Sequence, residues 1–104
     1  MGCYNDKVVR DLPFLAKIGL VTLNNCRQAC WRYGFKYFGV QNSNLCYCGD
    51  TYNKYGKVDD VRCQKRCLGN KAQICGDLWL NNIYETGIGG KPSIDKDTDS
   101  GADT

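Results

Sequence analysis

Two closely spaced pairs among the eight cysteines of this chain constrain its fold more than any other feature of the sequence. Cys26 and Cys30 are four residues apart, a spacing that places both sulfurs on one face of a helix. Cys46 and Cys48 are two residues apart, which places both sulfurs on one face of a strand. Each pair spans roughly 6–7 Å, so the two pairs can be brought into register. We therefore expect a helix joined to a strand by two adjacent disulfides.

The residues around these cysteines predict the same two elements. Thr22 is a candidate N-cap, residues 23–33 contain neither Pro nor Gly, and Gly34 can take the left-handed conformation that ends a helix. Residues 35–41 (FKYFGVQ) are apolar on both faces, as in a central strand. After a polar NSN turn, residues 45–49 (LCYCG) predict the strand that carries the second cysteine pair.

Two further elements are expected towards the C-terminus. Asp59 or Asp60 can cap a second helix in residues 61–68 (VRCQKRCL), which again carries two cysteines four residues apart. Residues 77–85 (DLWLNNIYE) predict a last strand. The expected fold class is α+β: a small disulfide-rich domain with two short helices packed on an antiparallel sheet.

The even number of cysteines indicates an oxidising compartment. A chain of 104 residues buries only a modest core, and each disulfide adds about 2–4 kcal/mol of stability. No apolar run reaches the length of about 18 residues that a membrane helix needs. The first residues, MGCYNDKVV, lack the apolar core of a signal peptide, so we expect a mature or excised segment. The predicted location is secreted or extracellular, including a fragment of an ectodomain.

Residues 1–86 and 87–104 differ in charge. The first range carries twelve Lys/Arg against seven Asp/Glu, a net charge of +5, and the second carries two against four, a net charge of −2. We expect residues 2–86 to form the domain and residues 87–104 to be a disordered acidic tail. The positive charges are scattered, which is typical of a solvated surface and argues against nucleic acid binding.

The sequence resembles the WSC domain, a cysteine-rich extracellular module of fungal cell-wall stress sensors, polycystin and Kremen receptors. The resemblance covers residues 2–86. It rests on GCY at 2–4, C-x3-C at 26–30, YFGVQ at 37–41, CYCG at 46–49, YG at 55–56, C-x3-C at 63–67 and QICGDLWLNNIY at 73–84. The chain departs from the family at Asp77, where a second glycine is usual. We expect only a local change of turn there, because Asp tolerates the left-handed region.

Eight cysteines allow 105 pairings. Spacing supports two helix–strand bridges and a short loop closed by Cys67 and Cys75, but it leaves the crossed pairs Cys26–Cys48 and Cys30–Cys46 open. The resemblance implies one pairing: Cys3–Cys63, Cys26–Cys46, Cys30–Cys48 and Cys67–Cys75.

Composition argues against an enzyme. The sequence contains no histidine, so it cannot assemble a Ser-His or Cys-His nucleophile pair. Paired cysteines leave no thiolate, and C-x-C spacing suits a structural zinc site poorly, so no metal or other cofactor is expected. Carboxylates such as Asp50 with Asp59 or Asp60 lie in turn and cap positions, which indicates solvated residues rather than a glycosidase pair.

Twelve aromatic residues exceed what a small core requires. Tyr52 and Tyr55 lie in a polar loop with Asp50 and Asn53, and a sugar ring stacks on an aromatic ring while polar neighbours bind its hydroxyls. The alternative is that these tyrosines complete the thin core. Weaker candidates for the same surface are Trp31, Tyr47, Gln41 and Asn44. The aromatic residues expected in the core are Tyr4, Tyr37, Phe38, Trp79 and Tyr84.

The resemblance implies a non-catalytic carbohydrate-binding module whose partner is a glycan or polysaccharide. The alternative is a protein–protein interaction module of a secreted protein or receptor ectodomain. Neither function involves nucleic acid or insertion of this segment into a membrane.

Overall fold

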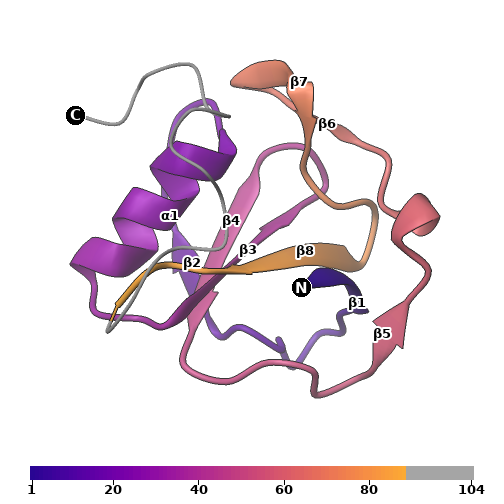
Figure 1. The fold of residues 1–104 in the computed structure, drawn as a ribbon, viewed down its shortest axis with the longest axis horizontal. Helices are drawn as coiled ribbons and strands as arrows, with labels where there is room; N and C mark the ends of the chain where they lie inside the picture. Colours follow the sequence, from indigo (N-terminus) through magenta and orange to yellow (C-terminus); the bar gives the residue numbers. More distant parts are fainter. Residues whose placement is uncertain (89–104) are drawn as a thin grey trace.

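The computed structural model describes residues 1–88, which form one α-helix and a set of antiparallel strands (Figure 1). In chain order the elements are β1 (Gly2–Asn5), β2 (Phe14–Ala16), α1 (Leu23–Arg32), β3 (Tyr37–Gln41), β4 (Leu45–Gly49), β5 (Lys57–Val58), η1 (Asp60–Arg62), β6 (Arg66–Cys67), β7 (Asn70–Ile74) and β8 (Leu80–Glu85). The expected α+β class is confirmed. From residue 89 onward the predicted tail lies outside the described residues, so the domain boundary remains a prediction. Within residues 1–88, no helix is long and apolar enough to cross a bilayer.

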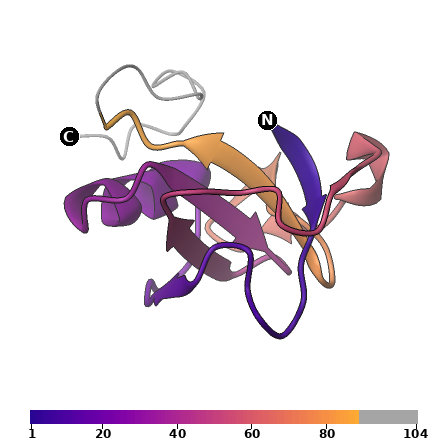
Figure 2. The same cartoon turned by 90° about the horizontal axis from the view of Figure 1, so that it is seen from below.

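The main sheet has six strands in the order β2-β4-β3-β8-β1-β5, while β6 and β7 pair separately. β3 lies between β4 and β8, as its two apolar faces predict. α1 packs against β2, β3 and β4 and covers one face of that half of the sheet, as Figures 1 and 2 show. β5 and η1 lie at the other end of the molecule.

α1 begins and ends where the sequence predicts. Thr22 is the N-cap: its Oγ1 accepts a hydrogen bond from the Asn25 N–H (3.0 Å), and Asn25 Oδ1 accepts one from the Thr22 N–H (2.8 Å). This reciprocal pair is a capping box. Gly34 follows the helix with φ +87°, and its N–H donates to the Trp31 carbonyl (3.0 Å). A glycine in this conformation ends a helix without strain.

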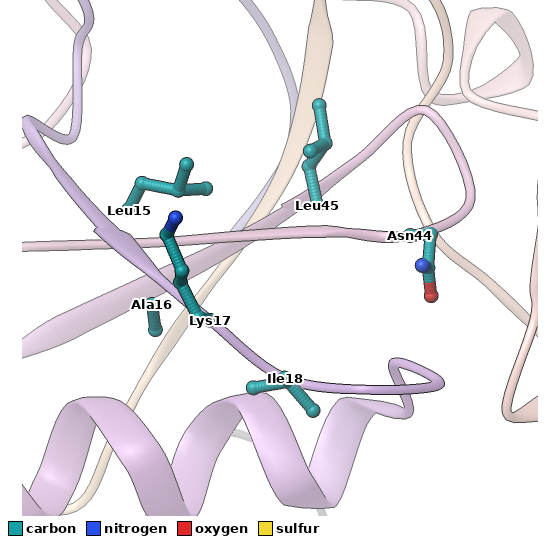
Figure 3. Close-up of a pocket in the computed structure, with 6 residues that line it drawn as sticks. All are labelled: Leu15, Ala16, Lys17, Ile18, Asn44 and Leu45. Atoms are coloured by element: carbon teal, nitrogen blue, oxygen red, sulfur yellow. The ribbon is translucent and has the colours of Figure 1, made fainter.

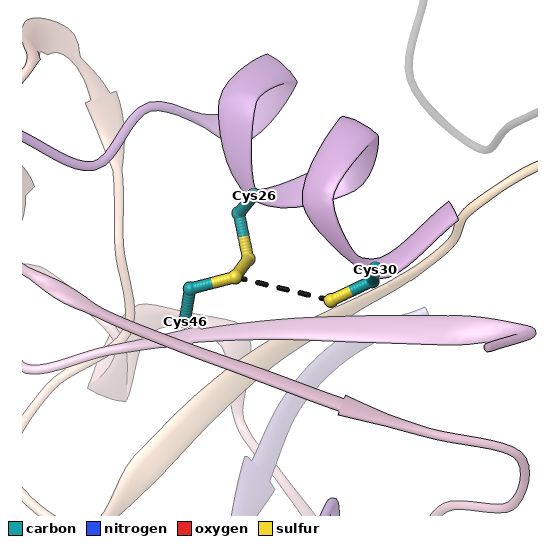
Figure 4. Close-up of side chains that lie close together, drawn as sticks. All are labelled: Cys26, Cys30 and Cys46. Carbon is teal, nitrogen blue, oxygen red and sulfur yellow. Dashed lines mark hydrogen bonds between the residues drawn. A yellow bond between two sulfur atoms is a disulfide. The ribbon is translucent and has the colours of Figure 1, made fainter. Parts of the chain in front are cut away.

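The two helix–strand disulfides form in the uncrossed arrangement. Cys26 bonds to Cys46 and Cys30 to Cys48, with Cα–Cα distances of 5.6 and 5.3 Å. The two bridges are adjacent, since Cys30 Sγ lies 3.9 Å from Cys46 Sγ (Figure 4). Every cysteine is paired, so none of these sulfurs is a thiolate that could bind a metal. The pairing implied by the resemblance is confirmed, including Cys3–Cys63 and Cys67–Cys75.

The prediction of a second helix in residues 61–68 is wrong. Residues 61–68 contain the end of a 3-10 turn, η1, followed by an extended segment that includes β6. Cys63 has an extended backbone and bonds to Cys3 in β1, whereas Cys67 bonds to Cys75 just after β7. The two cysteines therefore meet partners in different parts of the molecule, while a helix would place both sulfurs on one face.

This segment also lacks an apolar face that a helix could bury. Its apolar ends, Val61 and Leu68, are both exposed. Short helices depend on tertiary packing of an apolar face for their stability. The backbone pairs with the residues just after β7 instead: the Lys65 N–H donates to the Gly76 carbonyl (2.9 Å), and the Cys75 N–H donates to the Lys65 carbonyl (2.7 Å).

The last strand starts later than predicted, because residues 77–80 form a tight turn. The Asp77 N–H donates to the Leu80 carbonyl (3.0 Å), and the Leu80 N–H donates to the Asp77 carbonyl (3.1 Å). Positive φ angles fall on Gly76 (67°) and Trp79 (59°), so Asp77 does not take the left-handed conformation considered for it. Trp79 was expected in the core and is exposed, because the turn carries it out of the sheet.

Side chains are buried on both faces of the sheet. On the α1 side, Phe38 lies among the disulfides and stacks on Tyr84, with ring centroids 5.2 Å apart. The buried cluster on the far side consists of Tyr4, Leu12, Tyr47 and Ile83, with Tyr52 packed against it. Leu12 and Tyr52 come from the loops 6–13 and 50–56. These two loops therefore complete the core of the far face, and they determine the surface above it.

Candidate functional site

The loop 50–56 is held in place by buried and exposed carboxylates. Asp11 is buried, and its carboxylate accepts hydrogen bonds from the Asn53 N–H (2.9 Å) and the Lys54 N–H (3.0 Å). Asp50 Oδ1 accepts a hydrogen bond from the Lys36 N–H (3.1 Å). The loop is thus fixed in its middle as well as at its start, which reduces the entropy that it would lose on binding a ligand.

Tyr52 lies half-buried with its ring on the far-side core. Its centroid is 4.7 Å from that of Tyr37 and 5.4 Å from that of Tyr4, which it meets edge to face. The pKa of Tyr4 is raised mainly by burial of its ring and, to a smaller extent, by the neighbouring Tyr52. Tyr52 therefore combines the two roles considered for it, because it completes the core and leaves part of its ring at the surface.

Truncation of Tyr52 is expected to lower the free energy of unfolding. The change Tyr52→Ala removes two ring–ring contacts from a half-buried position, so we expect a loss of about 2 kcal/mol, below the cost of a fully buried ring. Urea denaturation measures this loss. Tyr52→Phe is the matched control, because it keeps both ring contacts and should stay within about 0.5 kcal/mol. An alanine variant as stable as its parent would show that the ring does not contribute to the core.

Tyr55 is half-buried, and its hydroxyl and its ring each contact the loop 6–13. Its hydroxyl donates a hydrogen bond to the Val9 carbonyl, and Lys7 Nζ lies 5.0 Å from the ring centroid. Asn53, two residues earlier, is exposed. The four loop candidates are therefore neighbours along one short segment: Tyr52, Tyr55, Asp50 and Asn53. Tyr52 packs on the far-side core, whereas Tyr55 packs on the loop 6–13.

The weaker candidates lie elsewhere. Trp31 is 51% exposed on α1, which covers the opposite face of the sheet from the loop 50–56. Tyr47 and Gln41 are buried on the far face. Asn44 Oδ1 accepts a hydrogen bond from the Val21 N–H (2.9 Å), so its amide oxygen has a structural partner. These four residues do not form one surface with the loop.

A shallow pocket of about 200 Å³ lies beside β2 (Figure 3). It is lined by Leu15, Ala16, Lys17, Ile18, Asn44 and Leu45. Asn44 is the only candidate residue among them, and the lining contains one charged side chain. The pocket offers no converging group of polar side chains, which a specific ligand site needs.

Sequence reasoning missed an aromatic–cation stack on the far face. The guanidinium carbon of Arg10 lies 5.0 Å from the ring centroid of Tyr47 and 4.7 Å from that of Trp79. Trp79 is 42% exposed. No local pattern links these residues, because they lie in a loop, in β4 and in the turn before β8.

A buried carboxylate holds the arginine of this stack. Asp6 accepts hydrogen bonds from Arg10 Nη1 (2.9 Å), Gln41 Nε2 (2.9 Å) and the N–H groups of Lys7 and Asp11 (both 2.9 Å). Burial alone would raise the pKa of Asp6. The hydrogen bonds outweigh burial, and the pKa lies below its ordinary value. Asp6 therefore remains ionised at neutral pH and compensates the charge of Arg10.

Comparison with known proteins identifies similar sequences. A family model for the WSC domain matches residues 1–77. The chain is 40% identical over 92 residues to xylosyltransferase oxt of Drosophila pseudoobscura pseudoobscura, which covers 85% of this chain and 10% of the relative. It is 30% identical over 95 residues to Kremen protein 1 of Homo sapiens (86% and 20% covered) and 29% identical over 77 residues to protein SLG1 of Saccharomyces cerevisiae (74% and 18% covered). The chain thus spans a tenth to a fifth of the length of these relatives.

Proposed function

The chain belongs to the WSC domain family, and on that premise we propose that it is a non-catalytic module that binds a glycan or polysaccharide. The domain is extracellular, and its four disulfides suit an oxidising compartment. Xylosyltransferases are among its relatives, but the match spans only a tenth of the first two. The sequence has no histidine and every cysteine is paired, so it offers neither a Ser-His nor a Cys-His nucleophile pair.

The observation that carries the proposal is the fixed, aromatic-rich loop 50–56. It carries the half-buried residues Tyr52 and Tyr55 together with the exposed residues Asp50 and Asn53. An aromatic ring packs against the apolar C–H face of a sugar, and amide or carboxylate groups bind its hydroxyls. Because Asp11 fixes the backbone of the loop, binding orders little of the chain.

Variants of Asn53, which is exposed, and Tyr55, which is half-buried, test this function. Asn53 has φ +74°, which glycine adopts freely, so Asn53→Gly removes the amide and preserves the backbone. We expect the double variant Asn53→Gly/Tyr55→Ala to lose at least about tenfold in affinity for the polysaccharide that the parent retains. Each removed contact accounts for about 1 kcal/mol of binding. Pull-down on insoluble cellulose, chitin, xylan and β-1,3-glucan, followed by depletion isotherms, measures the change.

The control for this experiment is Val8→Ser/Val9→Ser, which alters an exposed neighbouring loop and leaves the loop 50–56 intact. This control should bind as the parent does. Unchanged affinity of the Asn53→Gly/Tyr55→Ala protein, with its fold shown by circular dichroism, would rule out the loop as the binding surface.

The loop 6–13, which carries Val8 and Val9, favours a second candidate function, binding of a protein. Val8 and Val9 are largely exposed between Lys7 and Arg10, a combination of apolar and cationic side chains that occurs at protein interfaces. An arrayed set of extracellular proteins tests this candidate. A partner whose binding is lost in Val8→Ser/Val9→Ser but kept in Asn53→Gly/Tyr55→Ala would support it, and retention by both variants would contradict it.

A further inference from the structure

We propose that Trp79, which packs against the Arg10 guanidinium, is a platform for a neutral β-linked pyranose unit of the glycan. This inference rests on the proposed glycan-binding function and assigns a second contact surface to it. The surface lies at the turn before β8 and is made of other residues than the loop 50–56.

Two aromatic rings pack against the Arg10 guanidinium. Tyr47 is buried in β4, and the guanidinium carbon of Arg10 lies 5.0 Å from its ring centroid. The ring centroid of Trp79 lies 4.7 Å from the same carbon. Arginine stacks well on aromatic faces because its guanidinium is planar and weakly hydrated. Arg10 thus holds the indole in place, while 42% of the Trp79 surface remains accessible to a ligand.

The backbone at Trp79 gives a second reason to assign a function to this ring. Trp79 is the third residue of the turn 77–80 and has φ +59°. Turns with positive φ at this position favour Gly or Asn, and a bulky side chain there is strained. Strained positions of this kind cluster at binding sites. The core does not account for the ring, because Trp79 and its neighbour Leu78 are both exposed.

The electrostatics of the stack favour a neutral ligand. The Arg10 side chain is 28% exposed, and its charge is compensated by Asp6, whose side chain is 1% exposed and 2.9 Å away. An acidic sugar would therefore find no unpaired cation at this position. A guanidinium has five N–H donors, and among the described contacts its hydrogen bonds all come from Nη1. The other donors suit a sugar hydroxyl at the edge of the platform.

The shape of the platform selects the type of sugar. A flat indole face packs best against a ring that presents only C–H groups, and a β-linked pyranose with equatorial hydroxyls presents such a face. Glucose, N-acetylglucosamine and xylose units all have this form. Because Arg10 already holds the indole, little side-chain freedom is lost on binding.

The two tryptophans of the chain provide the test, since Trp31 lies on α1 away from the stack. In Trp31→Phe, Trp79 is the sole tryptophan and reports on the platform by fluorescence. In Trp79→Asn, Trp31 is the sole tryptophan and serves as the matched control. Asn tolerates positive φ, so this second variant relieves the strain at the turn and should unfold close to the parent midpoint.

Both variants are titrated with cellohexaose, chitohexaose, xylohexaose and laminarihexaose, with calorimetry as an independent measure of affinity. We expect a saturable change in the emission of Trp31→Phe, no change in Trp79→Asn, and at least a tenfold loss of affinity in Trp79→Asn. Calorimetric binding that leaves the Trp79 emission unchanged, or equal affinity of folded Trp79→Asn, would overturn the platform and leave glycan binding standing. Absence of binding by the parent to any glycan, including the insoluble polysaccharides, would overturn both.

Discussion

Replacing Cys3 and Cys63 together by alanine is expected to lower the free energy of unfolding by about 4 kcal/mol, the largest effect of any single disulfide. The bond joins residues 60 apart in the sequence and closes most of the folded chain into one loop. In the chain-entropy account, a disulfide stabilises by restricting the unfolded chain, and the effect grows with the logarithm of loop length. Urea denaturation of the oxidised proteins measures the loss.

The matched control is the pair Cys67 and Cys75, which are only 8 residues apart. The same account gives about 2.5 kcal/mol for their replacement. Both replacements leave the two helix–strand disulfides intact. Equal losses in the two double variants would mean that local packing around the sulfurs, and not loop length, determines what each bond contributes.

The second large effect is expected at Asp6. The change Asp6→Asn keeps the size of the side chain but places an amide N–H₂ group among hydrogen-bond donors: Arg10, Gln41 and two backbone N–H groups. Removing the charge from a buried ion pair costs about 3–5 kcal/mol when both partners are fully buried. Arg10 is 28% exposed, so we expect a loss of about 3 kcal/mol at pH 7. Urea denaturation again gives the value.

The effect of Asp6 should depend on pH in a defined direction. Its pKa is lower in the folded protein than in the unfolded chain, where an Asp titrates near about 3.9. A depressed pKa means that the carboxylate contributes its full stability above the unfolded value and loses it as the pH falls through the folded value. The difference between the parent and Asp6→Asn should therefore be constant from pH 7 to about pH 5 and shrink below about pH 4. A difference that stays constant down to pH 2 would contradict this role.

Asp6 also links the stability of the far face to its surface. The loop 6–13 carries Leu12 into the core, and Asp11 of the same loop fixes the loop 50–56. Asp6 holds Arg10, on which Trp79 stacks. One buried residue thus helps to position both surfaces to which we assign glycan contacts, since its carboxylate binds Arg10 and its N–H donates to the Trp79 carbonyl (3.0 Å).

The amino-acid sequence by itself determined the helix–strand unit at the centre of this protein. The cap at Thr22, the glycine at position 34 and the cysteine spacings are local signals, which act over a few residues and do not depend on the rest of the fold. The α+β class and the central position of β3 followed from local patterns of the same kind, and the family resemblance followed from motifs spread over residues 2–86. The resemblance, and not the spacing, selected the uncrossed disulfides.

The tertiary structure alone decided the rest, because the interactions that matter there join distant parts of the chain. Cys63 and Cys67 have the same spacing as Cys26 and Cys30, yet their partners lie in different places and no helix forms. Trp79 belongs to an apolar stretch of the sequence, yet the turn 77–80 places its side chain outside the core, against Arg10. Local sequence patterns indicate which face of a short helix or strand is apolar, but they do not indicate which loop will cover that face. In this protein, the loops 6–13 and 50–56 make that choice through hydrogen bonds and ring contacts that form only when the chain is folded.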